Sequence, residues 1–136
     1  MSYVGNSSTI IVPIKSYENA SSTPYSTTVT PVTYLTLTFT PTYSGYALVQ
    51  YNLQAESSTA ASTAKSQAQI YQDASPVGHA TTITNPGNGH LYELNGLKRV
   101  AVVAGVATTI TIRVNYVTSD SQTINSGVMV ILTNLS

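Results

Sequence analysis

The chain has 136 residues, which is enough for one domain with a single hydrophobic core. Only 7% of the residues are charged, against roughly 25% in ordinary soluble domains, and the formal net charge is zero. The few basic residues are scattered, which excludes a phosphate-binding patch for nucleic acid, and no apolar stretch approaches the roughly 18 residues of a membrane-inserted span.

The first 33 residues predict an extended N-terminal arm. Residues 9–14 (TIIVPI) are apolar, and Pro13 predicts either a short edge strand or a strand that ends in a bulge, because proline donates no hydrogen bond to a neighbouring strand. Residues 16–33 are rich in Ser, Thr and Pro and predict an extended excursion. We therefore expect an arm over residues 1–33 and a folded domain over residues 34–136.

The next two segments carry the clearest strand patterns. Residues 34–40 (YLTLTFT) alternate strictly between apolar side chains and threonine, which predicts a strand with one face in the core and one in water. A break at Pro41–Gly45 follows, and residues 45–54 alternate again. The start of this second strand is apolar or aromatic on both faces, because Tyr46 and Leu48 alternate with Ala47, Val49 and Tyr51.

Shorter strands and turns follow in the middle of the chain. Residues 56–66 carry many Ser and Thr and no helical apolar stripe, which predicts a loop. Residues 66–73 predict a strand, residues 74–79 a turn and residues 79–84 a weak strand. The NPGNG segment at 85–89 is the strongest turn signal in the chain.

The last third continues the same pattern. Residues 90–94 predict a strand that ends in a tight turn at Asn95-Gly96, followed by residues 97–105, whose Gly105 permits a sharp return. The remaining segments are a long alternating strand at 106–118, a polar loop at 119–127 and a closing strand at 128–135. About eight short strands with frequent turns indicate an all-β sandwich or barrel.

The order of these segments is similar to that of a known family. In FTPTYSGYALVQYNL, a Pro and a Gly-Tyr pair precede a central strand; ELNGLKRVAVVAGVATTITIRV holds a strand, a glycine return and a long strand; SGVMVILTNL closes the chain. Over about residues 34–135 the chain resembles the tumour necrosis factor-like and complement globular-head jelly rolls, and the trimeric heads of phage fibres and virion decoration proteins. The resemblance implies a jelly-roll sandwich that assembles as a homotrimer.

The alternation also predicts the core. The expected core residues lie on the apolar faces of the predicted strands: Leu35, Leu37, Phe39, Val49, Leu53, Ile70, Val102, Ile110, Ile112, Val114, Val130 and Leu132. Truncation of a fully buried Phe39 to alanine is expected to cost about 3–5 kcal/mol of stability.

The residues that carry catalytic chemistry are few and dispersed. His79 and His90 flank a predicted hairpin, and we interpret them as ordinary turn residues rather than metal ligands. The carboxylates Glu56, Asp73, Glu93 and Asp120 are far apart in the sequence, in or beside loops. The sequence contains no G-x-S-x-G elbow and no phosphate-binding loop. We therefore expect a non-enzyme with no catalytic residue, no cofactor and no metal site.

Binding contacts are expected from aromatic and apolar side chains instead. Tyr17, Tyr25 and Tyr43 fall in predicted loops or the arm, where a tyrosine can stack on a sugar or anchor a protein partner. A two-layer sandwich buries only one face of the strand at 45–54. We therefore predict that Tyr46 and Leu48 meet another subunit or the arm, whose Ile10, Ile11 and Val12 are the matching interface candidates.

The leading functional hypothesis is a structural protein of a virus particle: a trimeric capsid decoration, spike or fibre-head subunit that contacts other capsid or fibre proteins. A neutral, hydroxyl-rich composition is common in such proteins, and the N-terminus lacks the basic and apolar regions of a signal peptide, which favours the virion as its location. The alternative is an extracellular or cell-surface module that binds carbohydrate, or a strand-donating subunit of an extracellular filament.

Overall fold

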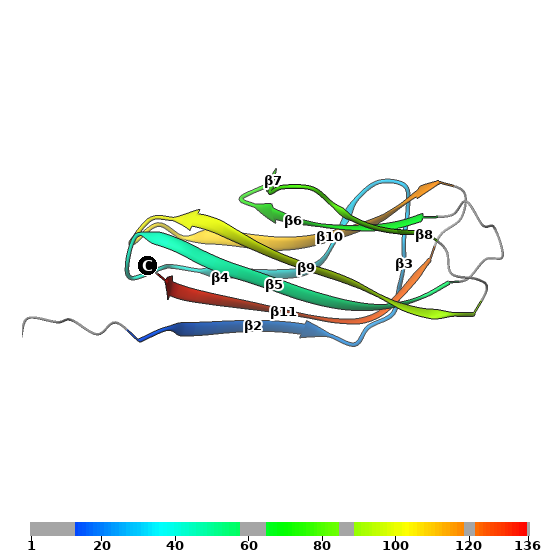
Figure 1. Cartoon of the computed structure of the whole chain (residues 1–136), viewed down its shortest axis with the longest axis horizontal. Helices are drawn as coiled ribbons and strands as arrows, with labels where there is room; N and C mark the ends of the chain where they lie inside the picture. Colours follow the sequence, from blue (N-terminus) through cyan, green and yellow to red (C-terminus); the bar gives the residue numbers. More distant parts are fainter. Residues whose placement is uncertain (1–12, 58–64, 85–88, 119–121, 136) are drawn as a thin grey trace, which may run out of the picture.

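The computed structural model describes residues 13–57, 65–84, 89–118 and 122–135. The regular structure in these ranges is β-strand, arranged as two antiparallel sheets that lie one over the other (Figure 1). The β-branched and aromatic residues that dominate the alternating segments favour this pleated, half-buried arrangement. The prediction of an all-β sandwich is confirmed.

The first sheet has the order β2-β11-β5-β9, and the short strand β3 also pairs with β11. Its strands are β2 (Lys15–Ser21), β3 (Tyr25–Ser26), β5 (Gly45–Glu56), β9 (Leu91–Val102) and β11 (Thr123–Leu135). The closing strand β11 therefore lies between β2 and β5.

The second sheet has the order β4-β10-β6-β7, and β8 also pairs with β6. Its strands are β4 (Val32–Phe39), β6 (Lys65–Gln72), β7 (Ser75–Pro76), β8 (Thr81–Thr84) and β10 (Thr108–Thr118). Apart from the two-residue strands β3 and β7, the orders β2-β11-β5-β9 and β4-β10-β6-β8 are those of a jelly roll, in which the chain crosses repeatedly between the sheets.

The segment before residue 34 is part of this architecture. We expected an extended excursion at residues 16–33, but β2 and β3 there both pair with β11. β2 supplies the first strand of the jelly roll and forms one edge of its sheet. The expected edge strand at residues 9–14 lies almost wholly outside the described residues.

The predicted core is largely confirmed. The buried members of the predicted set are Leu35, Phe39, Val49, Leu53, Ile70, Val102, Ile110, Ile112 and Val114. Leu37 is partly buried and packs against this core.

The prediction was wrong for Val130 and Leu132, which are only half-buried, because the opposite face of β11 carries Met129 and Ile131 into the core. Residues 128–132 are an unbroken apolar run, so periodicity does not determine which face is buried. A register shift between Ile124 and Ser126 determines it instead. This register shift comes directly after Thr123 and Ile124. Both residues belong to β11, although the sequence predicted a polar loop there.

The turn predicted at Asn95-Gly96 is also wrong. Both residues lie inside β9, where Asn95 pairs with Asn52 and Gly96 pairs with Tyr51. Gly96 does not form a turn; its missing side chain leaves room for the ring of Tyr51. The return at Gly105 is confirmed, because this glycine adopts a left-handed φ of 76° between β9 and β10.

Candidate functional site

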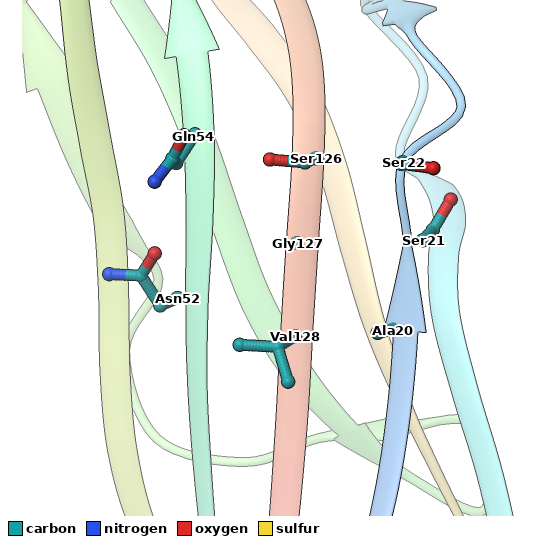
Figure 2. A pocket seen from close by; sticks show the side chains of 8 residues that line it. All are labelled: Ala20, Ser21, Ser22, Asn52, Gln54, Ser126, Gly127 and Val128. Atoms are coloured by element: carbon teal, nitrogen blue, oxygen red, sulfur yellow. The ribbon is translucent and has the colours of Figure 1, made fainter.

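The outer face of the β2-β11-β5-β9 sheet is the most distinctive surface of the described residues. Even-numbered residues of β5 point outward, since Ala47, Val49 and Leu53 are fully buried on the inner face. Figure 2 shows Asn52 and Gln54 of β5, Ser126 and Val128 of β11 and Ala20 of β2 on three adjacent strands.

An open groove of about 380 Å³ crosses these strands. It is lined by the side chains or backbone of eight residues: Ala20, Ser21, Ser22, Asn52, Gln54, Ser126, Gly127 and Val128. The lining combines amides and hydroxyls with small apolar groups, and it contains no charged residue. Such a surface can donate and accept hydrogen bonds without the desolvation cost of an ion.

Gly127 of β11 lies between the groove and the core. In the pairing of β11, Gly127 lies between Ser21 of β2 and Leu53 of β5. A Cβ atom at Gly127 would overlap the Leu53 side chain and would lie 3.1 Å from Cε2 of Tyr34. The core side chains beneath the groove therefore require glycine at this position, while the small side chains of Ala20 and Ser126 keep the outer surface low.

Asn52 is held in place by the neighbouring strand β9. Its amide nitrogen donates a hydrogen bond of 2.5 Å to Oε1 of Glu93 and a second one to Oδ1 of Asn95. Figure 2 shows this nitrogen turned toward β9 and the amide oxygen turned away from it. A rigid strand and two hydrogen bonds thus orient an acceptor oxygen at the groove.

Two further hollows adjoin the groove on the same sheet. One, of about 290 Å³, is lined by Gln54, Leu91, Tyr92, Glu93 and Asn125. The other, of about 160 Å³, is lined by Gln50, Tyr51, Asn52, Val128 and Val130. The first hollow shares Gln54 with the groove, and the second shares Asn52 and Val128 with it. The three hollows therefore form one extended polar track along β5.

The same face becomes apolar toward the start of β5. We define the apolar patch as Tyr46, Leu48, Leu97, Val130 and Leu132. Leu48 pairs with Leu132, and Gln50 lies between Leu97 and Val130 in the next row. Tyr46 is 42% exposed and Leu97 is 56% exposed. The Arg99 guanidinium lies 4.2 Å from the centre of the Tyr46 ring.

The other predicted contact residues lie elsewhere. Tyr17 is in β2, half-buried, with its ring 5.2 Å from that of Phe39, and Tyr25 is in β3 and packs against the core. Both therefore contribute to the packing of the interior, and neither lines the groove. Tyr43 is 48% exposed in the turn between β4 and β5. Ile10, Ile11 and Val12 lie outside the described residues.

The residues considered for catalysis remain dispersed. Asp73 accepts a 2.8 Å hydrogen bond from the backbone nitrogen of Thr109, and His79 borders a small hollow with Tyr51 and Lys98. Within the described ranges, no three His, Cys, Asp or Glu side chains come together as a metal site would require. The part of the chain that the structure describes also contains no helix with the length and apolarity to span a membrane.

Two tyrosines titrate abnormally. Burial raises the pKa of Tyr51 above its ordinary value of 10.0, although the hydrogen bond from its hydroxyl to Oγ1 of Thr81, 3.0 Å long, acts in the opposite direction. Burial likewise raises the pKa of Tyr92, whose hydroxyl lies 2.5 Å from Oγ of Ser66. Both hydroxyls join the two sheets, so these shifts concern stability rather than catalysis.

Of the known proteins compared with this chain, only solved structures are similar to it. No family model and no curated protein sequence matches the chain. A family 35 carbohydrate-binding module from Clostridium thermocellum is similar at 12% identity and a TM-score of 0.45, over 87% of this chain and 98% of that one. CBM35 from Paenibacillus barcinonensis is similar at 13% identity and a TM-score of 0.37, over 89% and 99%.

A third similar structure is the exo-beta-1,3-galactanase Pc1,3Gal43A from Phanerochaete chrysosporium, solved with galactose. Its identity is 12% and its TM-score 0.35, and the match covers 91% of this chain but 30% of the galactanase.

Sequence reasoning did not find the groove. It predicted a strand at residues 45–54 with Gln50, Asn52 and Gln54 on one face, an extended excursion that contains Ser21 and Ser22, and a polar loop that contains Ser126. The available signal was the row of three amides on one face of one strand. Its importance depends on which small residues lie beside it on β2 and β11, and only strand pairing reveals that.

Proposed function

We propose that this protein is a non-catalytic carbohydrate-binding module that takes a neutral glycan into the groove across β2, β11 and β5. The observation that carries the proposal is the uncharged lining, in which Asn52, Gln54 and Ser126 lie beside apolar Ala20 and Val128. Sugar hydroxyls both donate and accept hydrogen bonds, as do amides and hydroxyls of a protein. Sugar C–H faces in turn suit small apolar groups.

The length of the polar track favours a chain of sugars over a single one. The groove and its two neighbouring hollows follow β5 and share lining residues, so one extended ligand can contact all three. The site lies on paired strands, which hold contact groups more precisely than loops do. An extracellular or particle-surface location is part of the proposal, and the low charge and the hydroxyl-rich composition support it.

Binding to a panel of soluble neutral polysaccharides, measured by affinity electrophoresis and then calorimetry, tests the proposal. Gln54→Ala removes an exposed amide from the groove, and Ala20→Phe fills it; we expect the first to weaken binding about five-fold or more and the second to abolish it. Gln67→Ala, on the outer face of the other sheet, is the control and should bind normally. Equal loss in the control, or no binding to any member of the panel, would overturn the proposal.

The apolar patch supports a second function, as a subunit of a larger assembly such as a virus particle. Burial of Tyr46 and Leu48 in a subunit contact is worth roughly 1.5–3 kcal/mol per side chain. A symmetric oligomer uses the same patch in every copy, which multiplies this gain. The trimeric decoration, spike or fibre head and the open-ended filament predicted from the sequence belong to this alternative.

Native mass measurement tests the assembly. We expect a closed oligomer that dissociates when Tyr46 and Leu48 are both replaced by serine, without loss of the monomer fold. Val117→Ser is the control, because Val117 is also 42% exposed but lies on β10 of the other sheet. A wild-type monomer at high concentration would contradict this second function, while open-ended polymers would favour the filament over the trimer.

A further inference from the structure

The outer face of the β4-β10-β6 sheet holds two buried polar atoms without a hydrogen-bond partner. They are Oγ1 of Thr111 and Nε of Arg113, two residues apart on β10, the strand that lies between β4 and β6. Both side chains point outward, since Ile110, Ile112 and Val114 between and beside them are fully buried on the inner face. Buried donors and acceptors in native proteins are nearly always satisfied, so this pair requires an explanation.

The Arg113 side chain is held in a defined place. Its guanidinium lies 4.1 Å from the centre of the Tyr71 ring on the adjacent strand β6. Strand pairing sets Thr111 directly opposite Tyr71 and Arg113 opposite Gln69, so these four side chains occupy one small area. Within the described ranges, no carboxylate forms an ion pair with Arg113. A cation is thus positioned on a ring while its charge and its Nε lack an anionic partner.

The groups around Arg113 indicate what kind of anion fits. Its neighbours on this face are uncharged hydroxyls and amides, such as Thr36, Gln69 and Asn115. Among the exposed large apolar side chains of the described residues, Val117 lies near the end of β10 and none lies on β4, β6 or β8. A protein partner usually needs an apolar centre to its contact, which this face lacks. A polyhydroxylated ligand with a carboxylate suits both the unpaired cation of Arg113 and the uncharged hydroxyls and amides around it.

We propose that the outer face of β10 carries a second binding site, which takes the carboxylate of an acidic sugar on Arg113. A guanidinium binds a carboxylate through two parallel hydrogen bonds. Stacking on the Tyr71 ring holds the Arg113 guanidinium on this face before the ligand binds. The carboxylate draws the guanidinium outward and gives Nε an acceptor, while Thr111, Gln69 and Asn115 bond the ring hydroxyls. This site belongs to the opposite sheet from the groove, so it does not rest on the function proposed above.

The chain provides a matched control for this site. Arg99 also lies on a tyrosine ring, that of Tyr46, at 4.2 Å, but it belongs to the outer face of the other sheet. Arg99→Gln therefore removes the same charge from the same kind of stack elsewhere. Arg113→Lys keeps the charge and loses the planar fork, so it separates general charge attraction from carboxylate recognition.

Titration with oligogalacturonate, the carboxyl-reduced oligosaccharide and poly-glutamate tests the proposal, with binding followed by calorimetry and by the NMR signal of the Arg113 Nε–H. We expect the wild type to bind oligogalacturonate, with a shift of that signal, and not the reduced form. Arg113→Gln should lose at least about ten-fold in affinity, Arg113→Lys an intermediate amount and Arg99→Gln nothing. Thermal unfolding of each variant confirms that it is folded.

Three results would overturn the proposal. One is an unshifted Nε–H signal with no binding by the wild type, which needs no variant to interpret. Another is an equal loss of affinity in Arg99→Gln and Arg113→Gln. The third is equally tight binding of poly-glutamate, which would make the ligand an acidic polypeptide instead of an acidic sugar.

Discussion

The ring of Tyr51 lies against Gly96, its pairing partner on the adjacent strand β9. A Cβ atom at Gly96 would lie 2.6 Å from Cζ and 2.7 Å from the hydroxyl oxygen of Tyr51. The hydroxyl donates to Oγ1 of Thr81, which in turn donates to the backbone oxygen of Asn95. A glycine in the middle of a strand thus allows an aromatic side chain to reach across the sandwich and join β5, β8 and β9.

This contact makes Gly96→Ala a strongly destabilising change. The added methyl group displaces a buried ring and weakens its hydrogen bond, which should cost about 1–3 kcal/mol in the free energy of unfolding measured in urea. In a Tyr51→Leu background the same substitution should cost much less, because the ring is gone. Equal costs in the two backgrounds would show that Gly96 has another role.

The second prediction concerns stability at high pH. The pKa values of Tyr51 and Tyr92 are raised in the folded state. Above pH 10.0, the ordinary pKa of tyrosine, the unfolded chain releases these two protons while the folded protein keeps them. The resulting stability is fully present below pH 10.0 and is lost as the pH rises through the folded-state pKa. Urea unfolding at a series of alkaline pH values measures the loss.

Tyr51→Phe and Tyr92→Phe provide the control for this dependence. Each should cost about 1 kcal/mol near neutral pH, since one buried hydrogen bond disappears. Each should also reduce the decline in stability above pH 10.0. If the decline is unchanged in the double variant, other groups are responsible for it.

The third prediction is a stabilising substitution in the turn between β6 and β7. Asp73 and Ala74 both have positive φ angles, 48° and 73°, as a tight two-residue hairpin requires. Left-handed backbone costs a residue with a Cβ roughly 1–2 kcal/mol, which glycine avoids. We expect Ala74→Gly to raise the midpoint of thermal unfolding.

Ala101→Gly is the control, because Ala101 is exposed on β9 and has no positive φ. Glycine there should destabilise by about 0.5–1 kcal/mol, since it only adds freedom to the unfolded chain. A lower midpoint for both variants would mean that the turn is not strained by Ala74.

The fourth prediction tests the orientation of β11. Ile131 is fully buried and Leu132 is only half-buried on the outer face. Ile131→Ala should cost about 2–5 kcal/mol, and Leu132→Ala clearly less, in the free energy of unfolding of the monomer. The opposite order would restore the core face that the sequence alone indicated.

Much of the fold follows from short-range patterns. The alternation of apolar side chains and threonine over residues 34–40 and 106–118 matches most of β4 and all of β10, with the expected faces buried. Gly105 lies in the return between β9 and β10 as expected, because a left-handed backbone conformation favours glycine. Such features depend on neighbouring residues along the chain, which is why they can be read without a structure.

The errors all arise where a residue's role depends on another strand. Asn95-Gly96 has the composition of a turn, but Tyr51 of β5 makes Gly96 part of a continuous strand. The apolar run at 128–132 has two equivalent phases until the register shift near Ile124 selects one. β2 has no strong strand pattern of its own and exists as a strand through its hydrogen bonds to β11.

The candidate sites depend on tertiary structure even more. The sequence determined that the chain is a low-charge β protein whose titratable residues are dispersed, and that Tyr46 and Leu48 share a face with three amides. Only strand pairing placed Val128 between Asn52 and Ala20 in the groove, and Tyr71 next to Arg113 on the opposite sheet. The physical reason is that side chains alternate locally along one strand, while a binding surface consists of lateral neighbours that the register of separate strands selects.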